Sequence, residues 1–403
     1  MARDQRRGPL GPPPPRALLP RRETALAGLF LFAASYALYF QGATRHVPAL
    51  DDQDYEAQGT GWGLLTSLSP ELKTDRGTPY YFAHPPLVHF YVAASFAGWN
   101  RLDKLARYAK DETVEALYAE FRRDPELLPT RAANVFLAAL TVALLGAWAA
   151  RLSGKTWLGV LVAAAYGSNP EVFVRSSYGG YFAGDAFALL SLMLASSRAD
   201  FALAGAFAAL ANHKLVFLPL ALAAWRLREK REIHPALLGF MAGTALFWAW
   251  GLAIDARVFW IDHVRSHLLD RIAHDNPLGY GGYPDPAELW LQLSRHTGYL
   301  LLPLGAWALA DGLRRGKERA LLAPWAAWML MTALAFTVID WRQTKHLMPL
   351  LLPLFLAPAR WASFGRDQLR ATAAIMLALL AWNARAVAAL CRDFAGFNVT
   401  PGW

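Results

Sequence analysis

Apolar and polar residues of this chain separate into long blocks and do not follow the two-residue period of a strand. The apolar blocks are about 15–25 residues long, enough to cross a hydrocarbon core of roughly 30 Å. Backbone polar groups in lipid must be paired within the segment, so each block is expected to form an α-helix. Alternating segments of about ten residues, typical of membrane β-barrels, do not occur in the sequence. The pattern predicts an all-α, polytopic integral membrane protein.

The blocks predict about 11 transmembrane helices, most of them long enough to span a bilayer. The clearest spans are expected at about 24–41, 130–150, 156–169, 185–197, 235–252, 297–312, 319–339, 346–361 and 370–388.

A further apolar interval at 200–225 is interrupted by Asn212-His213-Lys214. If the short apolar helix that follows His84-Pro85-Pro86 crosses the membrane, 200–225 must form one long span. If that helix only dips into the bilayer, 200–225 forms two short spans that meet outside at Lys214. Both alternatives give the same number of crossings. The second is preferred because it places Asp185 outside and the basic residues of neighbouring turns inside.

Lysine and arginine gather in short segments between the apolar blocks, in a chain whose formal net charge is +9. Cytoplasmic loops carry such an excess, so the arginines before residue 24 place the N-terminus in the cytoplasm. This distribution argues against nucleic acid as a partner. The first block is read as a signal anchor in the inner (plasma) membrane, because no small-residue cleavage site follows it.

This orientation divides the chain into transmembrane and external regions. In order, they are a disordered basic N-terminal segment (1–23), a first transmembrane module (24–252) that includes a large external loop (42–130), a second large external loop (253–296), C-terminal transmembrane helices (297–389) and an external tail (390–403).

Several classes of site are excluded by the sequence. Cys391 is the only cysteine, so a disulfide framework or a thiolate metal site cannot form within one chain. The sequence contains no G-x-x-x-x-G-K-[ST], which argues against an ATP-driven pump, and no G-x-S-x-G or H-E-x-x-H motif.

Four acidic residues, Asp51, Asp52, Asp54 and Glu56, lie close together soon after the first apolar block. Adjacent carboxylates near a bilayer suit a general base or a cation site, because like-charge crowding and a low dielectric raise a carboxyl pKa. The alternative interpretation is a solvated acidic loop.

Two cations adjoin or interrupt apolar blocks. Arg175 precedes Asp185 in a Gly- and Tyr-rich segment that has the composition of a loop close to a ligand, and a mutual salt bridge is the alternative. Lys214 interrupts an apolar block, where a charge is costly and needs a lipid phosphate or an acid as its partner. Snorkelling of Lys214 at a helix end is the alternative there.

A third basic group, Arg342, Lys345 and His346, lies at a predicted outer membrane boundary. Positive charge on that side runs against the usual bias, and a phosphate is its natural partner. A simple interfacial anchor is the alternative interpretation.

His263 and His267 are spaced i, i+4 on a predicted helix of the second external loop. Two histidines make an incomplete zinc set. The charged neighbours Asp262, Arg265 and Asp270 favour a solvated helix face over a metal site.

Together these features resemble the GT-C superfamily of polyprenyl-phosphate-sugar-dependent glycosyltransferases, and most closely the branch of protein mannosyltransferases and aminoarabinose (lipid A) transferases. The resemblance covers about 24–361 and rests on an ordered set rather than on one motif. In order, the set is Asp51-Asp52, Tyr55, Gly77-Thr78-Pro79-Tyr80, His84-Pro85-Pro86-Leu87, Arg131, Arg151-Leu152-Ser153-Gly154, Asn169-Pro170 to Asp185, Lys214 and Lys345-His346-Leu347-Met348-Pro349-Leu350.

The resemblance implies inverting transfer of a sugar from a lipid-phosphate donor to a lipid, glycan or protein acceptor on the external face. Asp51 would be the base, although the family's glutamate is Asp52 here, so either acid is a candidate. Donor-phosphate binding would fall to Arg175, Lys214, Arg342, Lys345 and His346. Tyr55, His84, Tyr181 and Asp185 would bind substrate, and Asp51, Asp52 and Asp185 would hold a divalent cation (Mg or Mn) if one is used.

Two other functions were weighed. A transporter or lipid-linked sugar flippase would have intramembrane charges along a pathway, whereas here the charges gather on one face and no internal repeat is evident. A non-catalytic scaffold would have no need of the acids and of the candidate phosphate ligands.

Overall fold

The computed structural model describes most of the transmembrane part of the chain. The described residues are 21–45, 82, 85–87, 90, 91, 94, 95, 128–177, 181–230, 232–270, 285–338 and 346–392. Within these ranges the regular structure is helical and contains no strand.

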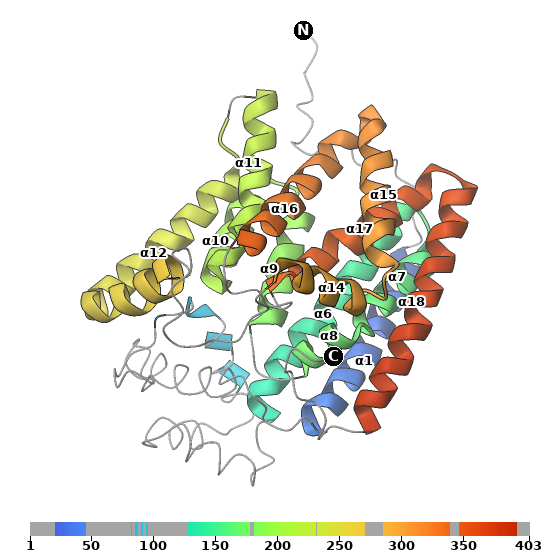
Figure 1. Cartoon of the computed structure of the whole chain (residues 1–403), viewed down its shortest axis with the longest axis horizontal. Helices are drawn as coiled ribbons and strands as arrows, with labels where there is room; N and C mark the ends of the chain where they lie inside the picture. Colours follow the sequence, from blue (N-terminus) through green and yellow to red (C-terminus); the bar gives the residue numbers. More distant parts are fainter. Residues whose placement is uncertain are drawn as a thin grey trace.

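The helices follow the predicted apolar blocks closely (Figure 1). The longer ones are α1 (Arg21–Arg45), α6 (Leu128–Ser153), α7 (Thr156–Gly167), α9 (Phe182–Leu194), α10 (Arg198–Ala211), α11 (Phe217–Lys230), α12 (Pro235–Phe259), α15 (Leu301–Arg314), α16 (Arg319–Val338), α17 (Leu351–Trp361) and α18 (Arg366–Arg392). Shorter ones are α8 (Pro170–Ser176), the 3-10 turn η1 (His213–Val216), the π-helical η2 (Trp260–Leu269) and α14 (Pro286–His296).

The all-α membrane architecture is confirmed. Among the described residues, five helices are long and apolar enough to cross a membrane, the first at Arg22–Thr44 and the last at Arg366–Arg392. Shorter apolar helices, including Phe182–Leu194, pack between them. The chain is therefore a multi-pass membrane protein.

The interval at 200–225 forms two helices, as the preferred alternative predicts. Helix α10 ends at Ala211, Asn212 adopts an extended conformation, and η1 leads into α11. The Asn212 side chain accepts a hydrogen bond from the Lys214 N–H, which caps the new turn. A polar residue that bonds its own backbone competes with the helix and ends it here.

The polar interlude after α7 contains one further helix that the sequence did not predict. Helix α8 covers seven residues, Pro170–Ser176, and places Arg175 in its last turn. Asn169 starts it by accepting hydrogen bonds from the N–H groups of Glu171 and Val172. Pro170 occupies the first position, where its missing N–H removes no helical bond.

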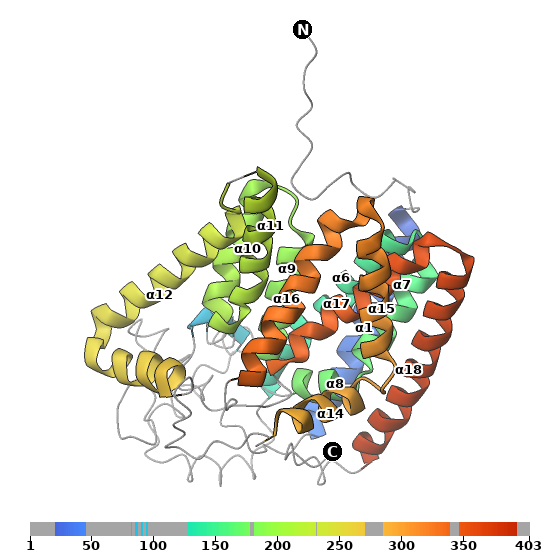
Figure 2. The same ribbon diagram turned by 45° about the horizontal axis from the view of Figure 1, so that its top comes forward.

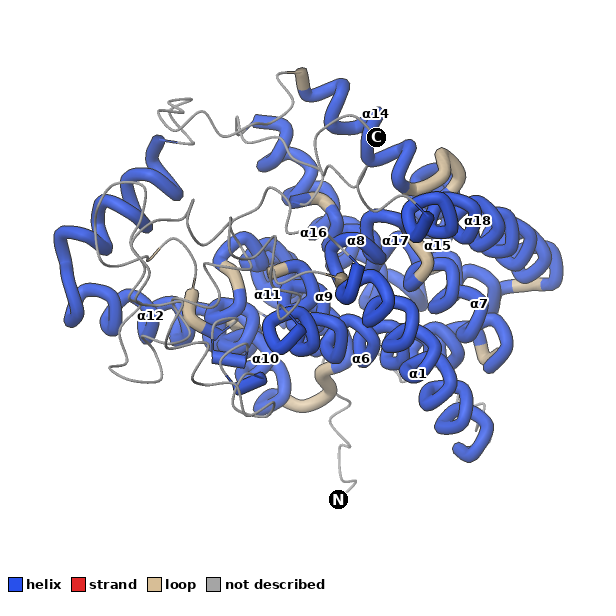
Figure 3. The backbone as a smooth tube through the Cα atoms, turned by 90° about the horizontal axis from the view of Figure 1, so that it is seen from below, coloured by secondary structure: helices blue, strands red, loops and turns tan. Residues whose placement is uncertain are grey.

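The helix connections gather at two opposite ends of the bundle (Figure 2). One end carries the turns between α6 and α7, α9 and α10, α11 and α12, α15 and α16, and α17 and α18; we call it the basic end, because Arg151, Arg198 and Lys317 lie there. The opposite end carries the C-terminus of α1, α8, η1 and α14, and we call it the site end. Figure 3 views the molecule from this end.

Small residues bring two helices into backbone contact. Helix α10 packs along α12, and a Cβ added to Gly239 would collide with the Ala202 carbonyl oxygen, while one added to Gly205 would collide with that of Ala236. Transmembrane helices approach this closely where glycine and alanine line the contact. This contact fixes α12 against α10, from which η1 continues.

Candidate active site

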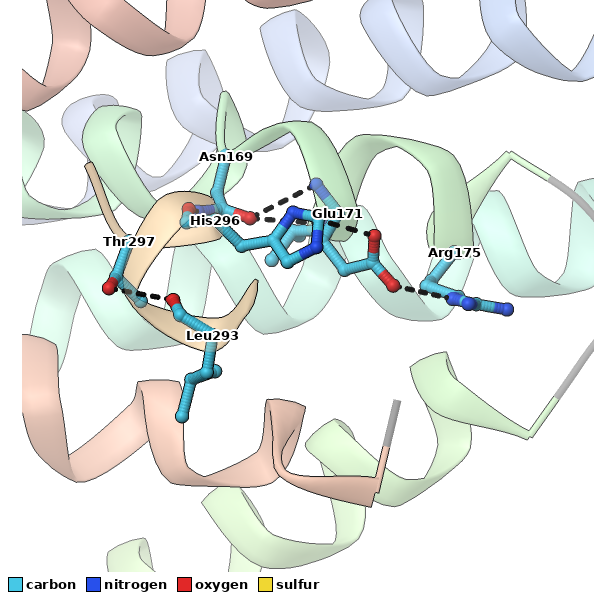
Figure 4. Close-up of polar contacts among 7 residues, drawn as sticks. Asn169, Glu171, Arg175, Leu293, His296 and Thr297 are labelled. Carbon is cyan, nitrogen blue, oxygen red and sulfur yellow. Dashed lines mark hydrogen bonds and ion pairs between the residues drawn. The ribbon is translucent and has the colours of Figure 1, made fainter. Parts of the chain in front are cut away.

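The site end contains a buried charged group on α8. Arg175 Nε lies 3.0 Å from Glu171 Oε1, one helical turn earlier, and both side chains are buried. His296 Nδ1, at the end of α14, lies 3.9 Å from Glu171 Oε2 (Figure 4). Glu171 therefore lies between an arginine and a histidine that come from different parts of the chain.

A backbone contact holds α14 against the start of α8. Asn169 Nδ2 donates to the His296 carbonyl oxygen at 2.6 Å, while the same side chain caps α8 through its oxygen (Figure 4). The chain then leaves α14 through Thr297, whose hydroxyl donates to the Leu293 carbonyl oxygen at 2.9 Å. Asn169 thus uses both ends of its amide to join the two helices.

A second buried ion pair lies between α9 and η1. Lys214 Nζ is 2.6 Å from Asp185 Oδ2, and the Asp185 side chain is 1% exposed. Asn212 Nδ2 donates to the same carboxylate oxygen at 3.3 Å. The other oxygen, Asp185 Oδ1, is buried and has no hydrogen-bond partner among the described residues. The carboxylate thus holds the lysine and still offers an acceptor.

The remaining described candidates lie near helix starts at the same end. Tyr181 is buried immediately before α9, and its carbonyl oxygen accepts from the Asp185 N–H at 2.9 Å. His346 is buried and stacks on Phe336, with ring centroids 5.1 Å apart and planes 4° from parallel. His346 lies just before the 3-10 turn (Met348–Leu350) that leads into α17.

The end of α1 is fixed beside these groups. Arg131 Nη1 donates to the Ala43 carbonyl oxygen at 2.7 Å, and Arg131 itself is 2% exposed. A buried guanidinium bound to an unpaired helical carbonyl is a favourable C-terminal cap. The C-terminus of α1 is therefore held at the site end of the bundle.

Several predicted site residues lie outside the described residues: Asp51, Asp52, Tyr55, His84, Arg342 and Lys345. Their predicted roles stay predictions. The alternative interpretation of Arg175 and Asp185 as a mutual salt bridge is wrong, because Glu171 binds Arg175 and Lys214 binds Asp185.

Two groups that the sequence did not point to contribute to this end: Glu171 and His296. The Asn212 amide, which belongs to the predicted polar break, contributes as well. The contact of Glu171 with Arg175 could have been predicted from the sequence, since acids and arginines spaced i, i+4 on a helix face each other. His296 had none, because its contact with Glu171 depends on how α14 docks.

The solvated interpretation of the second external loop needs correction. His263 is 3% exposed and Asp262 is 5% exposed, so the η2 face that carries them is buried. His263 packs against aromatic rings of α12, including Phe247. The side chain of His267 lies outside the described part of η2.

The described residues do not form a metal centre. No group of three or more His, Cys, Asp or Glu side chains in the described ranges is placed to hold an ion. Asp185, the described member of the predicted cation set, already faces two donors, Lys214 and Asn212. Lys214 already neutralises Asp185 at Oδ2, and the predicted metal role of Asp185 stays a prediction.

The sequence matches no protein-family model and no curated protein. Structures of ArnT are among the solved structures that resemble the chain. ArnT from Cupriavidus metallidurans bound to undecaprenyl phosphate is 14% identical over 91% of this chain and 71% of that one, with a TM-score of 0.57. The apo form of ArnT from the same organism is 15% identical over 91% and 69%, with a TM-score of 0.53. At these identities the likeness shows the fold alone: this chain has the GT-C membrane fold.

Proposed function

We propose that this protein is a membrane glycosyltransferase that takes a sugar from a polyprenyl-phosphate-linked donor and transfers it to a lipid, glycan or protein acceptor. The reaction takes place at the site end, which faces the outside of the inner membrane. The donor class is supported by the fold, because a solved structure with this fold, ArnT, binds undecaprenyl phosphate. The branch within the superfamily, the sugar and the acceptor are left to experiment.

The observation that carries the proposal is the Lys214–Asp185 pair at the site end of that fold. An ammonium held at 2.6 Å from a buried carboxylate requires costly desolvation of the pair, and a hydrophobic pair of similar size is often as stable. A reason to keep such a pair is that the lysine meets a second anion. The phosphate of the donor has the required charge and lies at membrane depth.

Inversion requires the acceptor oxygen to attack the anomeric carbon from the face opposite the phosphate. As the new C–O bond forms, the C–O bond to the phosphate breaks, and the phosphate takes up the bonding electron pair. The acceptor hydroxyl proton goes to Asp51, with Asp52 as the alternative base. Polyprenyl phosphate leaves with one more negative charge than it carried in the donor.

The added charge on the departing phosphate sets the need for cations. Fixed donors aimed at a developing anion stabilise the transition state more than the ground state. Lys214 and Arg175 lie at the site end, and we assign them this role together with Arg342, Lys345 and His346. Glu171 binds Arg175 through Nε, and this ion pair fixes the orientation of the guanidinium (Figure 4).

The test is transfer in proteoliposomes that contain a radiolabelled polyprenyl-phosphate sugar, for example the mannose or aminoarabinose donor, with a membrane extract as acceptor. Wild type is expected to transfer label, and Asp51→Asn to lose most of it, by roughly a hundredfold or more, as expected for general-base removal. Asp54→Asn is the matched control, because the resemblance gives Asp54 no role in the reaction.

The outcomes identify the base and distinguish a transferase from a flippase. Full transfer by Asp51→Asn with none by Asp52→Asn reassigns the base. Movement of intact donor across the bilayer without transfer, in wild type, refutes the transferase and supports the flippase.

A further inference from the structure

His213, next to Lys214 in the sequence, contacts His263. Neither histidine has a part in the chemistry proposed above. His213 Nδ1 lies 3.1 Å from His263 Nε2, which is hydrogen-bond distance. His213 opens η1, and His263 lies 50 residues later in η2. The contact joins the turn that carries Lys214 to a helix of the second predicted external loop.

Aromatic rings enclose the histidine pair. The Phe247 ring lies 5.1 Å from the His213 ring and 4.9 Å from the His263 ring, centroid to centroid. The Phe259 ring stacks on His263 at 5.2 Å. Packing alone would accept phenyl rings at both positions. A buried ring nitrogen without a partner carries a desolvation cost, so each histidine favours the placement in which the other faces it.

The turn between these contacts is anchored on two sides. Toward α9, Lys214 Nζ and Asn212 Nδ2 both bind Asp185 Oδ2, at 2.6 and 3.3 Å. Toward η2, His213 binds His263. His213 lies between Asn212 and Lys214 in the sequence, so the backbone position of Lys214 depends on both anchors.

We propose that His213 and His263 are positioning residues: their hydrogen bond holds η1 so that Lys214 meets the donor phosphate, and it couples the second external loop to that site. The catalytic part of this inference rests on the proposed function, whereas the mechanical part does not. Placement matters because a misplacement of about 1 Å in a catalytic group lowers rates by roughly a hundredfold.

The mechanical part is read from hydrogen exchange of the η1 amides. The Lys214 N–H donates to Asn212 Oδ1 and the Leu215 N–H to the Asn212 carbonyl oxygen, so opening of the turn frees both. In His263→Phe, exchange of these amides is expected to rise by roughly tenfold, which corresponds to the loss of about one net hydrogen bond. His263→Gln places an amide near the position of Nε2 and is expected to restore slow exchange.

Transfer kinetics read the catalytic part. His263→Phe is expected to raise the KM for the polyprenyl-phosphate donor by roughly tenfold while leaving donor-independent unfolding close to that of the control. The control is Phe259→Leu, which disturbs ring packing on His263 and leaves the His213–His263 contact in place. The double variant His213→Phe/His263→Phe leaves neither histidine to lose its partner. It therefore separates loss of the hydrogen bond from a folding defect caused by one histidine left alone.

Each result decides a part. Unchanged exchange of the η1 amides in His263→Phe overturns the whole inference, whereas faster exchange with an unchanged donor KM overturns its catalytic part. An equal effect of Phe259→Leu on both readouts reduces the pair to packing and overturns it too. If wild type neither binds nor transfers the donor, the proposed function fails and takes the catalytic part with it, while exchange still decides whether the histidines hold the turn.

Discussion

Lys214 Nζ lies 2.6 Å from Asp185 Oδ2, and this carboxylate is almost completely removed from solvent. Arg175 is held in the same way by Glu171, at 3.0 Å. Among the described candidates for phosphate binding, Lys214 and Arg175 therefore each have an acid of their own before any ligand arrives. In each pair the acid fixes the direction of the cation and offsets its burial, and an incoming phosphate must compete with it or share it.

Removal of the Asp185 carboxylate should lower the free energy of unfolding. Asp185→Asn leaves the Lys214 ammonium without its carboxylate, and breaking a buried pair in this way costs about 3–5 kcal/mol. A value near the lower end is expected, because the Lys214 side chain retains 20% exposure. The double variant Asp185→Asn/Lys214→Met should be more stable than Asp185→Asn alone. Thermal unfolding in detergent measures both, and additive losses would show that the two residues are not coupled.

The Arg175–Glu171 pair should depend on the shape of the guanidinium. In Arg175→Lys the positive charge remains, but the planar guanidinium that Glu171 orients through Nε is lost. We expect the turnover for donor transfer to fall roughly a hundredfold, as for loss of one transition-state donor. Arg198→Lys, an exposed arginine at the basic end, is the matched control. Equal turnover in the two variants would contradict a role for the Arg175 guanidinium.

How far the sequence predicted these features depends on the range of the interaction. The helix positions follow from block length and hydropathy, and the break at Asn212 follows from polar residues inside an apolar block. That Lys214 needs an anionic partner also follows from the cost of its burial. Each of these is a local property of the chain.

The sequence did not predict which acid pairs with which cation. Arg175 and Asp185 belong to one polar segment, yet α8 turns Arg175 toward Glu171 while Asp185 faces η1. His263 looked solvated because its neighbours are charged, but the Phe247 side of α12 covers it. Which face of a helix is buried, and against what, depends on packing between segments far apart in sequence.

The contact between α10 and α12 gives a prediction about stability. A methyl group at Gly239 would meet the Ala202 carbonyl oxygen, so Gly239→Ala must push two backbones apart. Overpacking of this kind costs about 1–3 kcal/mol. The matched control is Gly28→Ala in α1, where a Cβ meets nothing within 4 Å. There the substitution should be neutral or stabilising by about 0.5–1 kcal/mol, because alanine favours the helix. Equal melting temperatures of the two variants would contradict the close approach.

A histidine at the basic end should make stability depend on pH. His234 precedes the first residue of α12 and caps it: its Nδ1 accepts a hydrogen bond from the Ala236 N–H at 3.1 Å. Burial and the nearby Arg226 charge lower the pKa of His234 to about 4, from 6.5. The proton also competes directly with the cap, because a protonated Nδ1 cannot accept the Ala236 N–H.

The direction of the effect follows from the two pKa values. Above pH 6.5 both the folded and the unfolded chain carry neutral His234, so its contribution to stability is fully present. Between pH 6.5 and about 4 the unfolded chain binds the proton first, and the free energy of unfolding falls as pH falls. His234→Asn keeps a capping oxygen without a titrating ring. It should therefore flatten this part of the curve of melting temperature against pH, and an unchanged slope between pH 7 and pH 4.5 would assign the dependence to another group.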